Sequence, residues 1–366
     1  MTNTRIRISA LLLAISGLLT PHAAAFGAGK APKTHELTFS GKATPEQYYV
    51  PVYTSFTVPE GIVKISVTQH LGSGEARPGN LDLGIFDERG AGFEGPGFRG
   101  WSGGARRSFE IGETEATPGY LAGRINRGRW TVIQMPTTAG RTTDWTLKIT
   151  LTEGPRAKKL PAPSYAAPQL NDKPGWYRIA PHVHTVHSDG RLTPAEVIAL
   201  GKASGLDGIV STDHNTTSAL LHWGEVQDPE FLVINGMEVT YGQGHWNIFG
   251  LDPHAWIDFR IHHNDTLRYR KAVAKARKAG RLLVANHPYN LDFLYDVTPM
   301  DGIEVWNSAW SPANERAVEL WHTLLVGGNR KFAVASTDFH RGGNIASPHT
   351  VVRAEALSAE AVIDAI

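Results

Sequence analysis

The chain has 366 residues, enough for roughly two domains, and its 19% charged and 41% hydrophobic residues are ordinary for a soluble globular protein. The formal net charge is +1 without a long run of like charge, so composition does not support a nucleic-acid-binding or anionic-membrane role. Cysteine is absent, which excludes disulfides, thiolate metal ligands, a cysteine nucleophile and a lipid-modified cysteine.

Residues 1–25 predict a secretory signal peptide. Arg5 and Arg7 form a short basic start, Ile8–Leu19 is apolar, and Ala23–Ala25 offers a small-residue cleavage site. The apolar stretch is shorter than the roughly 20 residues that cross a bilayer, so an uncleaved anchor or a buried helix is the less favoured alternative. We therefore expect an exported protein, periplasmic or secreted, whose mature chain starts near Phe26 without an integral membrane segment.

Residues 26–153 predict an all-β sandwich domain. Short runs of alternating apolar residues are separated by Gly, Pro, Asn and Thr, which is the pattern of strands joined by turns. The runs are His35–Phe39, Tyr48–Val58, Val63–Val67, Leu81–Phe86, Trp130–Met135 and Trp145–Leu151. His35 and His70 are isolated, and no histidine cluster or pair of carboxylates marks a site in this part of the sequence.

Residues 154–174 predict a semi-extended linker because they are rich in proline. From residue 175 to residue 366, strands and helices alternate. The predicted strands are Tyr177–Val183, Gly208–Ser211, Phe231–Ile234, Leu282–Ala285, Gly302–Trp306 and Phe332–Ala335. The predicted helices are one that begins with a capping box at Thr193 and ends near Ser204, then Asp265–Ala279, Ala313–Leu325 and Ser358–Ile366. This alternation predicts a parallel sheet, open or closed into a barrel.

The helix at Ser358–Ile366 has no closing glycine and no basic last turn, so a C-terminus that has been cut short stays an open alternative.

Side chains that can bind metals follow the strands of this second region, where thirteen of the 16 histidines lie, between His182 and His349. The candidates are His182, His184, His187, Asp189, His214, Glu238, His245, His287, Asp338 and His340. Because the carboxyl ends of parallel strands share one face, we expect these groups to meet in space. Packing explains such a set poorly, since imidazoles and carboxylates are costly to bury unless they are paired or bound to metal.

The motifs that carry these residues, taken together, resemble the PHP (polymerase and histidinol phosphatase) superfamily, and within it the carbaryl-hydrolase-like CehA/McbA branch. The resemblance covers about residues 172–366. The matching segments are His182-Val-His184-Thr with Ser188-Asp189-Gly190, Thr212-Asp213-His214-Asn215, Gly236-Met237-Glu238-Val239-Thr240, Gly244-His245-Trp246-Asn247, Asn286-His287-Pro288 and Ser336-Thr337-Asp338-Phe339-His340.

The resemblance implies a distorted (β/α)7 PHP barrel with up to three metal ions. By residue-to-residue transfer it implies three ligand sets: His182, His184, Glu238 and Asp338; Glu238, His245 and His287; and Asp189, His214 and His340. Members often carry an Asp two residues before the first His of the pair, whereas this chain has Ala180-Pro181 there. That difference puts an outer hydrogen bond in doubt, and not the metal ligands themselves.

The mixed nitrogen and oxygen ligand set suits two or three divalent ions of Zn, Mn or Fe. A carboxylate such as Glu238 can bridge two ions about 3.5–4 Å apart, and a water between them would be deprotonated near neutral pH and act as the nucleophile. The preferred hypothesis is hydrolysis of a small-molecule phosphate ester. Arg341 is the candidate that neutralises substrate oxygens, with a surface salt bridge as the alternative; His187 is either a substrate contact or a polar surface group.

Two alternatives stay open. The same hydroxide could attack the carbonyl of a carbamate or carboxyl ester, with aromatic walls from Trp223, Trp246, Trp306 and Trp310. Alternatively, the β-domain could bind a glycan or polymer through exposed aromatics such as Trp101. No nucleic-acid partner is expected, Glu304 is left off the ligand set as an outer group, and the sequence does not determine the oligomeric state.

Overall fold

The computed structural model describes residues 32–72, 79–289 and 295–366. The expected signal peptide lies outside the described residues. Among the helices of the described residues, none is both long enough and apolar enough to cross a membrane.

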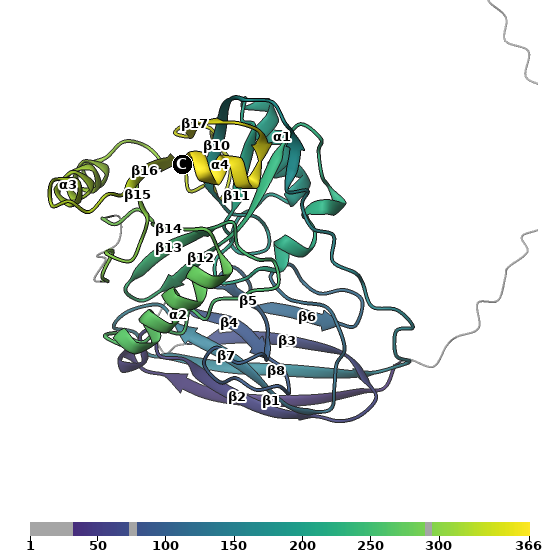
Figure 1. Cartoon of the computed structure of the whole chain (residues 1–366). Helices are drawn as coiled ribbons and strands as arrows, with labels where there is room; N and C mark the ends of the chain where they lie inside the picture. Colours follow the sequence, from purple (N-terminus) through teal and green to yellow (C-terminus); the bar gives the residue numbers. More distant parts are fainter. Residues whose placement is uncertain (1–31, 73–78, 290–294) are drawn as a thin grey trace, which may run out of the picture. The chain divides into compact units, whose positions relative to one another are not determined.

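The first part of the described chain forms two four-stranded sheets, whose strands carry the labels β1 to β8 in Figure 1. One sheet has the order β1 (Thr34–Ala43), β8 (Thr143–Glu153), β3 (Ile62–Gly72) and β6 (Ser108–Gly112). The other has the order β2 (Val52–Val58), β7 (Gly128–Pro136), β4 (Leu81–Phe86) and β5 (Phe98–Gly103). All pairings within them are antiparallel. Side chains from both sheets, such as Phe56, Val67 and Trp130, share one buried core, as expected for alternating strands packed face to face.

Strands β5 and β6 were not predicted. Strand β5 runs through the glycine-rich segment 90–104, whose composition is typical of turns. The reason for the strand is the packing of Trp101, which is only 2% exposed and lies 4.5 Å from the ring of Phe259. The expectation of an exposed Trp101 that could bind a glycan is therefore wrong.

The second part of the chain forms an eight-stranded sheet with the order β16-β15-β14-β13-β12-β11-β10-β17. Its strands are β10 (Gly175–Val183), β11 (Gly208–Ser211), β12 (Leu232–Tyr241), β13 (Gly244–Phe249), β14 (Leu282–Ala285), β15 (Gly302–Asn307), β16 (Phe332–Ser336) and β17 (Thr350–Ala354). Strands β13 and β17 run antiparallel to their neighbours, while the other pairings are parallel. The sheet is therefore mixed, and not wholly parallel as the sequence predicted. A two-stranded sheet, β9 (Gln169–Asn171) with β18 (Leu357–Ser358), ties the predicted linker to the end of the chain.

The helices accompany this second sheet, and Figure 1 shows α3 beside β15 and β16. They are α1 (Pro194–Ala203), α2 (Thr266–Ala279), α3 (Pro312–Val326) and α4 (Ala359–Ala365), with the short 3-10 turns η2 (Ser218–Leu221) and η3 (Trp223–Glu225), while η1 (Pro45–Gln47) lies between β1 and β2 of the sandwich. The capping box at Thr193 and Glu196 is present and starts α1, so the local sequence rule holds there.

The two ends of the eight-stranded sheet approach each other. The residue after β16 that closes the gap is Phe339, whose backbone N–H donates to the carbonyl of His182 and whose carbonyl accepts from the N–H of His184, at 3.2 and 2.8 Å. The sheet is thus nearly closed, although β13 and the small number of helices depart from a regular barrel of alternating strands and helices. This closure brings the carboxyl end of β10 against the segment that follows β16.

The sandwich and the larger sheet share a core. Phe86, Phe98 and Trp101 of the sandwich belong to the same buried apolar cluster as Trp246 and Phe259. Phe98 stacks on Trp256 with ring centroids 4.0 Å apart. The sandwich is therefore packed firmly against the part of the chain that carries the candidate ligands.

Candidate metal centre

Glu238, on β12, lies at the centre of the predicted ligands and is 0% exposed. Five imidazoles surround its carboxylate. The nitrogen-to-oxygen distances are 3.3 Å from His182, 3.4 Å from His184, 2.7 Å from His214, 3.2 Å from His245 and 3.5 Å from His287. Residues that span more than 100 positions of sequence therefore converge on one buried carboxylate.

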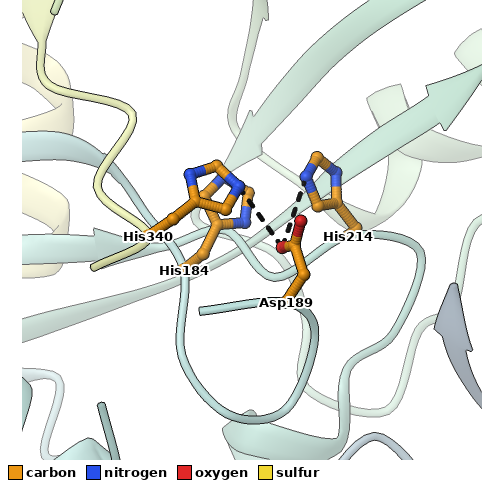
Figure 2. Close-up of side chains that lie close together, drawn as sticks. All are labelled: His184, Asp189, His214 and His340. Atoms are coloured by element: carbon orange, nitrogen blue, oxygen red, sulfur yellow. Dashed lines mark ion pairs between the residues drawn. The ribbon is translucent and has the colours of Figure 1, made fainter. Parts of the chain in front are cut away.

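A second group of ligand atoms surrounds Asp189, as Figure 2 shows. Its Oδ1 lies 3.3 Å from Nε2 of His340 and 3.7 Å from Nε2 of His214. Together with His184, these residues place four ligand atoms within 4.8 Å of one another. This group contains the third set that the family resemblance implies, with His184 in addition.

A third carboxylate, Asp338, lies between these groups. Its Oδ1 is 3.2 Å from Nε2 of His182 and 3.0 Å from Nε2 of His184, and its Oδ2 is 3.7 Å from Nε2 of His287. The nine candidate ligands all belong to groups that can hold a metal ion. The grouping differs in detail from the implied sets, because His287 lies with His182 and Asp338, while His245 lies with His214 and Glu238.

Outer contacts fix which ring nitrogen of His182 and of His340 faces the centre. Nδ1 of His182 is 3.0 Å from Oε1 of Glu304, which leaves Nε2 for the centre. Nδ1 of His340 is 2.8 Å from the carbonyl oxygen of Asp338, which leaves its Nε2 toward Asp189. Such contacts select the imidazole tautomer and orient the ring. Glu304 thereby provides His182 with a carboxylate partner.

Asp213 organises the loop that follows β10. Its carboxylate accepts hydrogen bonds from the N–H and hydroxyl of Thr185 and from the N–H and hydroxyl of Ser188, all between 2.7 and 3.1 Å. Gly190 allows the same loop to fold back, since a Cβ there would lie 2.5 Å from the carbonyl carbon of His184. These contacts fix the position of Asp189, which lies between Ser188 and Gly190 in the chain. The sequence signal for Asp213 was its place directly before the ligand His214.

Several turns at the centre are strained. His287 and Asp338 have φ angles of +25° and +52°, and Asn215, next to His214, has a φ of +58°. Side chains other than glycine rarely adopt this region unless surrounding contacts hold them. For Asn215 those contacts are visible, because its side chain accepts from the N–H of Thr240 and donates to the Thr240 carbonyl. Backbone strain thus accompanies the placement of the ligands.

The carboxylates and imidazoles of the centre shift each other's titration. Burial raises the pKa of Glu238, but His214, His182 and His245 outweigh it, and the pKa lies well below its usual range. Burial lowers the pKa of His214, yet Glu238 and Asp189 raise it to about 10. Burial together with His340 and His214 lowers the pKa of His184 to about 3. The carboxylates are therefore ionised and able to attract cations.

The donor set fits divalent metal ions. Nε2 of His182 and Oε2 of Glu238 are buried and make no well-formed hydrogen bond within the described residues, although other candidate ligands lie 2.7 to 3.4 Å away. Buried polar atoms without such a partner are uncommon in native proteins and call for an explanation. Neutral imidazole nitrogens and carboxylate oxygens are the ligands that Zn, Mn and Fe accept.

A pocket of about 560 Å³ opens on one side of the centre. Asp189, Asp338 and His340 line it, together with Arg341. Arg341 is exposed and, within the described residues, forms no ion pair. Arg341 is placed where it could meet a substrate at the centre.

His187 does not belong to any of the groups in the described residues that could hold a metal. It is 7% exposed, and its Nδ1 lies 2.8 Å from the hydroxyl of Ser218. Burial, with His222 and Arg106, lowers the pKa of His187 to about 3. The ring is therefore neutral and is neither on the surface nor among the ligand groups.

The tryptophans proposed as aromatic walls lie in two environments. Trp223 and Trp246 are 0% exposed within the core. Trp306 and Trp310 are exposed and pack edge to face with centroids 5.2 Å apart. The fully buried pair is therefore unavailable to an aryl group.

No family model matches the sequence, and no curated protein matches it. Among solved structures, a two-domain protein from Bacteroides vulgatus that contains a predicted PHP-like metal-dependent phosphoesterase is similar, with 21% identity, a TM-score of 0.39, and coverage of 57% of this chain and 67% of that one. An amidohydrolase from Chromobacterium violaceum with bound sulfate shows 17% identity, a TM-score of 0.38, and coverage of 51% and 96%. A protein from Bifidobacterium adolescentis, proposed to be a metal-dependent phosphoesterase, shows 16% identity, a TM-score of 0.32, and coverage of 54% and 94%. These similarities are weak, and the function must be argued from the site.

Proposed function

We propose that this chain is a metal-dependent hydrolase of the PHP superfamily, that it acts on phosphate esters of small molecules, and that it is exported. The supporting observation is the convergence of five imidazoles on the buried Glu238, with Asp338 and Asp189 beside it. A set of this size and chemistry is difficult to explain by packing, because each group costs free energy to bury.

The residues divide into ligands and groups that meet the substrate. Glu238, Asp338 and Asp189 would hold the divalent ions together with the surrounding imidazoles. Divalent ions bound here would lower the pKa of a water molecule and withdraw charge from the substrate oxygens. Arg341, at the rim of the 560 Å³ pocket, would pair with the non-bridging phosphoryl oxygens.

Hydrolysis of a carbamate or carboxyl ester is the second candidate, because the same centre could activate water for attack on a carbonyl. The lining of the 560 Å³ pocket favours phosphate, since Arg341, Asn344 and Ser347 are polar and none of the four tryptophans belongs to it. A phosphoryl group needs such cationic and polar contacts, whereas an aryl carbamate needs apolar walls.

The test combines metal content with two parallel assays. Metal per chain is measured by mass spectrometry in the purified protein, and p-nitrophenyl phosphate and p-nitrophenyl acetate are assayed with and without chelator. We expect at least two metal ions per chain and phosphate turnover that is lost in chelator. Asp338→Asn should lose activity and metal, while the matched control Asp144→Asn, on the exposed part of β8, should keep both. Full activity of a metal-free sample would overturn the proposal, and turnover of the acetate alone would replace phosphate by carboxyl ester.

A further inference from the structure

A second pocket reaches the metal centre from the side of the β-sandwich. It has a volume of about 440 Å³. Asp189, His214 and His245 line it on one side, and Tyr49, Asn80 and Asp82 line it on the other. The first three are candidate ligands, and the last three belong to the sandwich. No sequence pattern indicates this pocket, because the sandwich residues lie more than 100 positions before the ligands and form no motif.

Specific contacts fix the position of the sandwich relative to the metal centre. The guanidinium of Arg106 donates to the carbonyls of Val186 and Ser188, at 2.5 and 3.1 Å, in the loop that carries Asp189. The ring of Tyr49 lies against Gly242, where an added Cβ would be 2.8 Å from the ring. Gly242 sits in the turn between β12 and β13, which carry Glu238 and His245. The pocket wall is therefore fixed relative to the ligands on two sides.

Asn80 and Asp82 form a prepared polar surface in this wall. Oδ1 of Asp82 accepts from Nδ2 of Asn80 at 2.6 Å and from the hydroxyl of Thr137 at 3.2 Å. Oδ1 of Asn80 accepts in turn from Arg107 at 2.7 Å. Within the described residues, Oδ2 of Asp82 has no hydrogen-bond donor. The side chains are thus locked by their neighbours while one carboxylate oxygen is left to accept a hydrogen bond.

We infer that the β-sandwich forms the specificity wall of the active site, and that Asp82, positioned by Asn80, binds hydroxyl groups on the leaving group of the substrate. The inference rests on the proposed function and extends it from phosphate esters in general to esters of a polyol or sugar. A phosphoryl group at the centre would place its leaving group in one of the two flanking pockets, and the one built by the sandwich offers an acceptor for hydroxyl hydrogens. A ligand that binds here displaces water from the free carboxylate oxygen. Only a ligand with a hydroxyl group replaces the hydrogen bond of that water, so the oxygen discriminates strongly against ligands that lack the hydroxyl.

Binding of two phosphonates that differ only in hydroxyl groups tests this without turnover. The compounds are 3,4-dihydroxybutylphosphonate and butylphosphonate, and their affinities for the metal-loaded protein are measured by calorimetry. We expect the dihydroxy compound to bind at least about tenfold more tightly to the wild type, in line with the cost of leaving a buried polar group without a partner. Asp82→Ala should reduce that preference to within about threefold and leave butylphosphonate unchanged, while Asp144→Asn should behave as wild type. Equal binding of both compounds by the wild type, or a preference that survives in Asp82→Ala, would overturn the inference.

A second measurement separates failure of the wall from failure of the phosphoesterase proposal. The chain has no cysteine, so Ala105→Cys places a single thiol at the exposed edge of the same pocket. Alkylation of that thiol with a bulky maleimide should block turnover of whichever p-nitrophenyl ester the protein hydrolyses. Alkylation of the control Ala203→Cys, at the exposed end of α1, should not. If neither phosphonate binds the metal-loaded protein, the phosphoesterase proposal is wrong. In that case, the role of the sandwich as a wall of the active site is supported if alkylation of Ala105→Cys blocks turnover of the acetate. It is contradicted if alkylation does not block that turnover.

Discussion

Oε1 of Glu304 lies 3.0 Å from Nδ1 of His182, while the other nitrogen of that imidazole faces Glu238 and Asp338 at 3.3 and 3.2 Å. The second oxygen of Glu304 accepts from the N–H of His287 and from the side chain of Asn307, at 2.9 and 3.1 Å. The carboxylate of Glu304 therefore orients His182 on β10 and also the turn that presents His287.

Glu304→Gln should weaken metal binding without removing a ligand. Two donors face Oε2, so the amide oxygen should take that position and the amide nitrogen should face Nδ1 of His182. Nδ1 must then accept, which moves the imidazole proton to Nε2, the atom that faces the centre. Loss of such an outer partner typically costs 10–100-fold in metal affinity or activity, and we expect about that loss. Metal titration followed by calorimetry measures it. Glu319→Gln, on the exposed face of α3, is the control, and equal affinity in both variants would contradict the role of Glu304.

Arg106→Ala should affect the part of the centre around Asp189. The guanidinium holds the carbonyls of Val186 and Ser188, and Asp189 follows directly. Without it, the loop loses two charge-assisted hydrogen bonds, and we expect the occupancy of one metal ion per chain to fall by about tenfold at limiting metal. Metal content after dialysis against a metal buffer measures the change. Arg127→Ala, at an exposed position of the sandwich, should keep the full content; a stoichiometry that stays unchanged in Arg106→Ala would show that the loop needs no support from the sandwich.

Asp82 should make stability depend on pH. Burial raises the pKa of Asp82 from 3.8 to about 6, against the hydrogen bonds from Thr137 and Asn80. Between about pH 4 and pH 6 the folded protein therefore keeps a proton that the unfolded chain has released, so this group lowers stability as pH rises through that window. The amide of Asp82→Asn cannot ionise, so this variant should lack the decrease in stability that Asp82 causes as the pH rises. Urea unfolding of the wild type and of Asp82→Asn in chelator at several pH values gives the difference between their free energies of unfolding. This difference should change between about pH 4 and pH 6. A difference that is constant with pH would be inconsistent with a raised pKa.

Phe98→Ala should destabilise the whole described unit and not the sandwich alone. The ring is 6% exposed and stacks on Trp256 at 4.0 Å, inside the core that both parts share. Truncation of a buried phenylalanine to alanine costs about 3–5 kcal/mol. Denaturant unfolding monitored by tryptophan fluorescence and by far-UV circular dichroism should show one transition, displaced to lower denaturant for both probes. Leu37→Ala, at a partly buried position of β1, is the milder comparison. Two separate transitions in the wild type would show that the parts unfold independently.

The sequence predicted most strands and the ligand set because both depend on local patterns. Gly208–Ser211 and Leu282–Ala285 are strands with the predicted bounds, since short β-branched or leucine-rich runs between turn residues have few other conformations. Strand β13 was not predicted, since no strand was expected between Phe231–Ile234 and Leu282–Ala285. Its antiparallel pairing on both sides is decided by contacts with β12 and β14 that no local pattern encodes.

The parts of the site that sequence patterns missed depend on long-range contacts. Glu304 was recognised only as a polar residue at a strand end, and its partner His182 is 122 positions away. Asn80 and Asp82 reach the pocket only because the sandwich packs on the larger sheet. Hydrogen bonds over such distances follow from the tertiary fold, and a single sequence carries no signal for them.

Closure of the eight-stranded sheet has a consequence for the order of events during maturation. His184 and Asp338 meet across 154 positions of sequence, and they meet only when the segment after β16 pairs with the end of β10. A chain that has not made this last pairing lacks Asp338 and His340 at the centre, so the two groups that contain these residues are incomplete. Binding of the full set of ions should therefore report the completed fold, because only the closed sheet assembles all four groups.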